Sequence, residues 1–167
     1  MLLSPSRRQL LPNTIVVGFE KLTQKEMTTA IDKYCFDNAS QAYLTPDTDN
    51  KSILIYNCQV KKINPSCKCT FQIVAKRIRR CHEDIFRIES AYLEHGEYCV
   101  GVKPQPSLEY LLQHQAIKAY AIHNKPSKIL QYANLSYNFQ LSQSMASRLK
   151  AEASKTFLRE RFILQRY

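Results

Sequence analysis

The sequence predicts an α+β protein, with an amino-terminal helix, about four antiparallel strands and a carboxyl-terminal helical region. Three patterns predict this order: apolar residues recur at helical spacing before residue 36, alternate with polar residues between 41 and 94, and return to helical spacing after 107. Hydrophobic residues make up 44% of the 167 residues, with ten Tyr and seven Phe, so the chain can bury a core.

The amino-terminal helix is predicted from "FEKLTQKEMTTAIDKYCFDNA". Thr23, followed three residues later by Glu26, forms a capping box for the first turn. Met27 and Ile31 recur at helical spacing and predict the buried face. Cys35 falls near that apolar stripe, where a small buried hydrophobic residue is expected rather than a metal ligand.

The strands are predicted from period-two alternation of apolar and polar residues. In "QAYLTPDTDNKSILIYNCQV" the turn-forming cluster Pro46–Asn50 separates two β-rich runs, which is typical of a hairpin. The stretches "CTFQIVAKRI" and "DIFRIESAYLE" alternate in the same way, and the polar link "RIRRCHED" is short enough to be a hairpin loop. A meander of about four antiparallel strands follows.

A proline-containing stretch, "VKPQPS", predicts a linker before the helical region. One helix is expected from Ser107 to Asn124, a second with Pro126 in its first turn, and a third capped by Ser142. Two helices joined by a brief turn suggest a helix-turn-helix-like unit, although most such pairs bind no DNA. We therefore expect two domains, residues 14–101 and 107–167.

The net charge of +10 is unevenly distributed, because residues 51–80 contain eight Lys or Arg and no Asp or Glu. Such a block predicts polyanion binding, and the alternative is a solvated face that only keeps the protein soluble. The candidate DNA contacts are Lys61, Lys62, Lys68, Lys76, Arg77, Arg79 and Arg80. A second basic group, Arg148, Lys150, Lys155 and Arg159, fits a solvated helix face equally well.

Several functional classes are disfavoured. The chain has three Gly and no phosphate-cradling glycine motif. No apolar run approaches the roughly 20 residues that cross a bilayer, so no membrane partner is expected. Prolines and arginines interrupt the amino end before a signal-peptide core can form, which predicts an intracellular protein. Disulfides are rare inside cells, so the six cysteines need another explanation.

A metal site is that explanation. Cys58 closes the second predicted strand, Cys67 and Cys69 precede the third, and His95 and Cys99 follow the last. Ends of antiparallel strands meet at one rim, so Cys58, Cys67 or Cys69, His95 and Cys99 supply the four soft ligands of structural zinc. The alternative is free thiols and a surface histidine. Cys81 and His82 lie at the hairpin tip and are not expected to be ligands.

At these residues the chain resembles the zinc-binding DNA-binding region of Mutator-like element (MULE) transposases, which is related to WRKY and FLYWCH fingers. The matching motifs are a leading helix, then Cys58, Cys69-Thr70-Phe71, Phe86-Arg87-Ile88, Glu94-His95 and Cys99. "NKPSKILQYANLSYNFQLSQSMASRLKAEA" is similar to the helical unit that follows the finger in such transposases. The chain departs from the family in carrying Phe71 and Phe86 where tryptophans are common.

The resemblance implies Zn²⁺ held by Cys58, Cys69, His95 and Cys99, double-stranded DNA as the partner, and the nucleus as the location. It also implies that a strand edge enters the major groove. No Asp-Asp-Glu set is present, so neither catalysis nor a small-molecule substrate is expected. The chain is expected to be the recognition region of a transposase or a factor derived from one. A zinc-supported protein-interaction or RNA-binding adaptor is the alternative, and salt dependence distinguishes the two.

Overall fold

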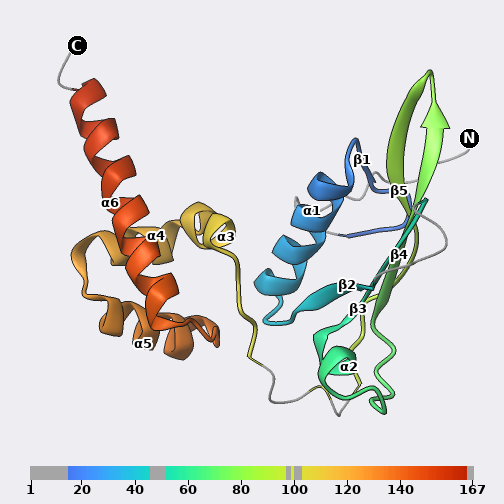
Figure 1. Cartoon of the computed structure of the whole chain (residues 1–167), viewed down its shortest axis with the longest axis horizontal. Coiled ribbons are helices and arrows are strands. Elements are labelled where there is room, and N and C mark those ends of the chain that lie inside the picture. Colours follow the sequence, from blue (N-terminus) through green and yellow to red (C-terminus); the bar gives the residue numbers. More distant parts are fainter. Residues whose placement is uncertain (1–14, 46–51, 97–98, 100–102, 165–167) are drawn as a thin grey trace, which may run out of the picture. The chain divides into compact units, whose positions relative to one another are not determined.

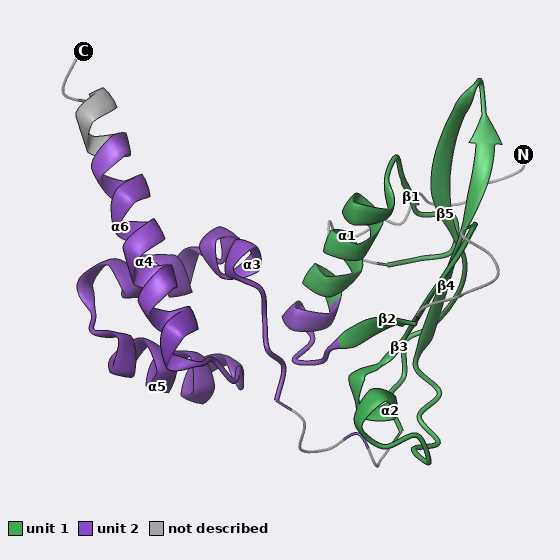
Figure 2. Cartoon of the chain, in the orientation of Figure 1, with its two compact units in different colours: residues 1–34, 42–98 green, residues 35–41, 99–167 purple. Residues whose placement is uncertain are grey.

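The computed structural model describes residues 15–45, 52–96, 99 and 103–164 (Figure 1), with no description of side chains beyond residue 160. The chain divides into two compact units (Figure 2). Unit 1 comprises residues 1–34 and 42–98, and unit 2 comprises residues 35–41 and 99–167.

Unit 1 contains an antiparallel five-stranded sheet with the order β1-β5-β4-β3-β2. The strands are β1 (Glu20–Lys21), β2 (Ala42–Thr45), β3 (Ile53–Cys58), β4 (Gln72–Arg80) and β5 (Glu83–Tyr92). The predicted α+β class is confirmed, and the sheet has one strand more than the four expected. The extra strand, β1, has only two residues, which is too short to show alternation. The predicted turn Pro46–Asn50 lies outside the described residues.

Helix α1 (Gln24–Asp37) lies on one face of this sheet (Figure 1). Its capping box forms as expected: the N–H of Glu26 donates to Thr23 Oγ1 at 3.1 Å, and that of Thr23 donates to Glu26 Oε2 at 3.0 Å. Met27 and Ile31 are fully buried. The hydroxyl groups of Thr28 and Tyr56, 2.9 Å apart, connect α1 to β3. Fully buried side chains of the central strands complete this core: Tyr56, Ile73, Ala75 and Ile88.

The β4–β5 hairpin is longer than the sequence predicts. Its turn is the two residues Cys81 and His82, with φ of 49° and 73°, instead of the whole polar link. Paired positive φ values are those of a tight hairpin turn that matches strand twist, so both strands continue to it. The register of β3 with β4 ends at Lys76. Beyond it, β4 and β5 continue as a projecting hairpin of residues 77–86, here named the ribbon (Figure 1), which β1 pairs with only at Phe86.

Among the described residues, four helices lie wholly within unit 2: α3 (Leu108–Gln113), α4 (Gln115–His123), α5 (Pro126–Tyr137) and α6 (Gln143–Leu164). They enclose a core that includes Leu111, Ile117, Ile129, Phe139 and Leu149. The single helix expected from Ser107 to Asn124 is two helices, because His114 is extended and its Nδ1 accepts from the N–H of Ile117 as a new cap. None of the described helices combines the length and apolar character needed to cross a bilayer.

Candidate metal centre

The four predicted ligands meet at one rim of the sheet. Cys58 is the last residue of β3, Cys69 lies just before β4, and His95 follows β5. Antiparallel pairing brings these strand ends together, and the thiol of Cys99 joins them. One potential ligand atom from each of the four side chains lies within 4.8 Å of the other three, so the cluster could hold a metal ion. Cys58 and Cys69 are buried, with 2% and 3% exposure.

The spacing of these atoms fits a tetrahedral ion. With metal–sulfur bonds of about 2.3 Å and metal–nitrogen bonds of about 2.05 Å, a sulfur and a nitrogen ligand are about 3.6 Å apart. The distance between Cys69 Sγ and His95 Nδ1 is 3.7 Å. This pair of atoms therefore already has the separation that a shared tetrahedral ion requires.

His95 is held ready for ligation. Its ring stacks on Phe71, with centroids 4.4 Å apart and planes 13° from parallel. Burial lowers the pKa of His95, which favours the neutral imidazole that binds metals. Its Nε2 is buried and has no hydrogen-bond partner in the described part of the chain. Nδ1 is the ring nitrogen near Cys69 Sγ, so an ion bound through Nδ1 would not itself satisfy Nε2.

The structure decides between Cys67 and Cys69 as the candidate ligand, which spacing in the sequence left open: Cys69 belongs to the cluster. The Thr70 hydroxyl donates to the carbonyl of Glu94 at 3.1 Å, which aligns the segment around Cys69 with the one around His95. Cys67 lies outside the cluster, is partly exposed, and has its N–H bonded to the carbonyl of Asn64. No cysteine is in a disulfide; Cys81 is exposed at the hairpin turn and Cys35 is buried on α1, both away from the cluster.

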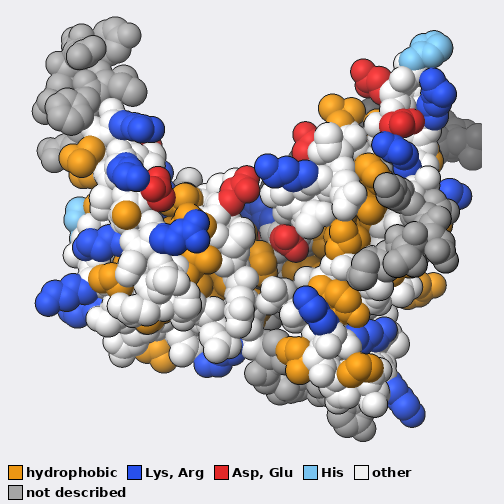
Figure 3. Space-filling model, in the orientation of Figure 1, with side chains coloured by type: hydrophobic (Ala, Val, Ile, Leu, Met, Phe, Trp, Pro, Cys, Tyr) orange, Lys and Arg blue, Asp and Glu red, His pale blue; other side chains and the backbone are white. Residues whose placement is uncertain are grey.

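The seven candidate DNA contacts do not form one patch. Lys61 and Lys62 lie on α2 (Gln59–Ile63), a short helix that the sequence did not predict, and Lys68 immediately precedes Cys69. Arg79 and Arg80 lie at the far end of β4. At about 3.3 Å per residue, the two ends of this strand are about 26 Å apart. Figure 3 shows basic side chains both over α2 and at the β4–β5 tip. The charged block is thus divided between opposite ends of the sheet.

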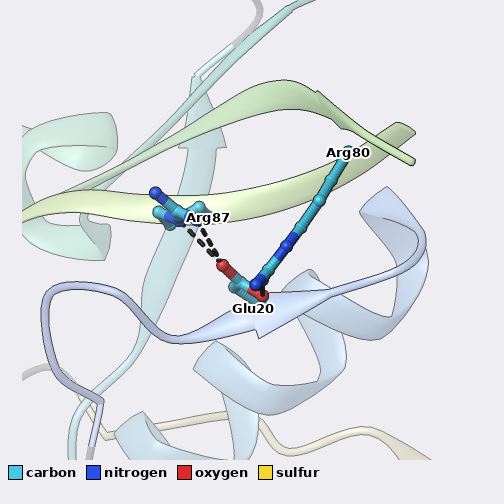
Figure 4. A network of polar contacts seen from close by, with 3 residues as sticks. All are labelled: Glu20, Arg80 and Arg87. Carbon is cyan, nitrogen blue, oxygen red and sulfur yellow. Dashed lines mark hydrogen bonds and ion pairs between the residues drawn. The ribbon is translucent and has the colours of Figure 1, made fainter. Parts of the chain in front are cut away.

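Most of the basic side chains on β4 are paired with acids. Lys76 lies 3.7 Å from Glu89, and Arg77 lies 3.5 Å from Asp84. Arg80 and Arg87 share Glu20 of β1, at 3.2 and 2.7 Å (Figure 4). The sequence block contains no acid, but antiparallel pairing brings acids from β5 and β1 beside it. Within the described residues, four candidates make no ion pair: Lys61, Lys62, Lys68 and Arg79.

The second basic group lies on α6 and is partly engaged within unit 2. Lys150 Nζ donates to the carbonyl of Asn124 at 2.7 Å, and Lys155 bonds Glu152 at 2.8 Å. These contacts favour a structural or solvated role for both lysines over contact with a partner.

Comparison with family models, curated proteins and solved structures finds no match to this chain.

Proposed function

We propose that the protein is a zinc-stabilised, sequence-specific binder of double-stranded DNA, related to the recognition region of transposases. The observation that carries this proposal is the position of β4 (Gln72–Arg80). Cys69, just before β4, belongs to the candidate metal centre, and the other end of the strand forms one side of the basic ribbon. An ion at the rim would fix the strand that presents the ribbon.

Zinc is the metal that the donor set favours. Three thiolates and one imidazole are soft and borderline ligands, which select zinc over magnesium or calcium. Cys58, Cys69, His95 and Cys99 would fill all four positions of a tetrahedral ion. A closed site of this kind is structural, so the ion would stabilise the rim rather than activate a water molecule.

The ribbon has the form that a duplex can accept, because the major groove admits a two-stranded antiparallel ribbon. Arg79 is exposed and makes no ion pair among the described residues, so it is available for a phosphate or a base edge. Lys76, Arg77 and Arg80 would exchange carboxylate partners for phosphates. We assign the duplex contact to this end of the sheet, and the resemblance to transposase recognition regions adds the nucleus as the proposed location.

Selection from random-sequence duplexes with the zinc-loaded full chain tests the proposal. We expect enrichment of a short motif, and weaker binding of that motif by an Arg79→Ala variant with unchanged zinc content. Flat enrichment at moderate salt would contradict sequence-specific DNA binding. Association that does not weaken as salt increases would instead favour the protein-interaction adaptor, because phosphate contacts are strongly salt-dependent.

A further inference from the structure

The sheet face opposite α1 carries a row of four side chains that neither the metal centre nor the ribbon uses. Strand register aligns Tyr43 with Asn57, Asn57 with Gln72, and Gln72 with Tyr92, across β2, β3, β4 and β5. Side chains alternate between faces, and neighbouring Tyr56 points toward α1, so this row lies on the outer face. Tyr92 is 63% exposed, and the other three are partly exposed.

A ladder of amide hydrogen bonds fixes the middle of this row. Gln72 Nε2 donates to Asn57 Oδ1 at 3.2 Å, and Asn57 Nδ2 donates to Thr45 Oγ1 at 2.7 Å. The ladder orients both side-chain amide groups. It uses one N–H of each amide, so the side-chain oxygen Oε1 of Gln72 and the second N–H of each amide are left for a ligand. Oriented amides between two tyrosines match the hydrogen-bonding edge of a nucleobase.

The two tyrosines are spaced for a nucleic-acid strand. Tyr43 and Tyr92 are three strand spacings apart, or about 14 Å at 4.7–4.8 Å each. A stacked strand rises about 3.4 Å per nucleotide, so on the order of four nucleotides span the row. Exposed aromatic rings on an open sheet provide stacking surfaces for successive bases.

The charge around the row complements a phosphate backbone. The Lys62 ammonium lies over the Tyr43 ring, 5.9 Å from its centroid, so a base that stacks on that face would displace the ammonium to the side, where it can pair with a phosphate. Lys61 is on the same short helix, and neither lysine makes an ion pair within the described residues. Glu89, an acid of β5, is paired with Lys76.

We infer that this outer face, here named the tyrosine platform (Tyr43, Asn57, Gln72 and Tyr92), binds single-stranded DNA. Bases stack on the two tyrosines, the amides contact base edges between them, and Lys62 contacts phosphate. Single-stranded DNA is chosen over RNA because the ribbon of the same unit is assigned to DNA, and in this choice alone the inference rests on the proposed function. The site is separate from the ribbon and does not depend on duplex binding there.

Fluorescence anisotropy with the zinc-loaded full chain and a labelled oligothymidylate about 12 nucleotides long tests this assignment. Tyr43→Ala and Tyr92→Ala should each weaken binding about 5- to 150-fold, the range measured for loss of one stacked base. Tyr43→Phe and Tyr92→Phe keep the ring and should bind within about twofold of wild type. Two controls should also bind normally: Leu135→Ala, which removes a 77% exposed side chain of unit 2, and Arg79→Ala, which weakens only duplex binding.

Absence of oligothymidylate binding by the wild-type protein would overturn the inference, as would phenylalanine variants that lose as much affinity as alanine variants. Binding of oligouridylate more than about tenfold tighter would assign the platform to RNA instead. Photo-cross-linking of an iodouracil-substituted oligonucleotide to wild-type protein needs no variant to fold. We expect cross-links in the peptides that contain Tyr43 and Tyr92, and cross-links confined to residues 77–86 would contradict the platform.

Discussion

Raising the salt concentration should weaken duplex binding moderately, because only one end of the sheet enters the proposed contact. Each phosphate neutralised contributes about −0.9 to the slope of log affinity against log salt. The ribbon end carries four of the seven candidate contacts: Lys76, Arg77, Arg79 and Arg80. The expected slope is about −3.6, or a loss of about 150-fold between 50 and 200 mM salt. All seven acting together would give about −6.3 and a loss of about 6,000-fold.

Anisotropy titrations of the selected duplex at several salt concentrations measure this slope. Arg79→Ala should reduce its magnitude by about 0.9, since Arg79 makes no ion pair among the described residues and is free to contact phosphate. Lys68→Ala removes a positive charge at the metal end and should leave the slope unchanged. A wild-type slope near −6, with equal reductions in the two variants, would refute the assignment of the contact to the ribbon.

Three further predictions concern the ligand choice and the stability of each unit. Cys69→Ser should lower the zinc content well below one equivalent while Cys67→Ser retains it, and the reverse pattern in metal analysis would make Cys67 the ligand. Burial raises the pKa of Asp32 from 3.8 to about 6, because the folded protein favours the neutral carboxyl group. The folded state is therefore most stable, as far as Asp32 is concerned, below pH 3.8, and it loses this stability as the pH rises through 6. Asp32→Asn should therefore raise the unfolding free energy at pH 7 by up to about 3 kcal/mol and remove that pH dependence in urea titrations, whereas equal curves for both proteins would contradict the shift. Leu149→Ala should destabilise unit 2 by about 2–5 kcal/mol in thermal or urea unfolding, and a loss below about 1 kcal/mol would show that the site is not packed as described.

The metal rim could be predicted from sequence because strand order alone determines which ends meet. Once β3, β4 and β5 are antiparallel neighbours, the residues after β3, before β4 and after β5 share one edge. The choice between Cys67 and Cys69 could not be made from spacing, since residues two apart in an extended chain point to the same side. It depends on the bond from Thr70 to the carbonyl of Glu94, which is a contact across 24 residues.

The charge pattern along the chain predicted the basic surface less well, because the acids that pair with β4 come from neighbouring strands. Glu20, Asp84 and Glu89 lie outside the basic block in sequence and beside it in the sheet. In the β4–β5 register Asp84 lies opposite Arg79, and it forms its ion pair with the diagonal neighbour Arg77. The amide and tyrosine row was also invisible, since its members come from four separate strands.

An ion at the rim would hold β4 in place, and elemental analysis of the protein shows whether such an ion is bound. Freshly purified, reduced full-length chain should contain about one zinc per molecule by elemental analysis. Cys58, Cys69, His95 and Cys99 would hold it. Protein that is folded by circular dichroism, contains no zinc and takes up none when zinc is added would show that no zinc ion stabilises the rim.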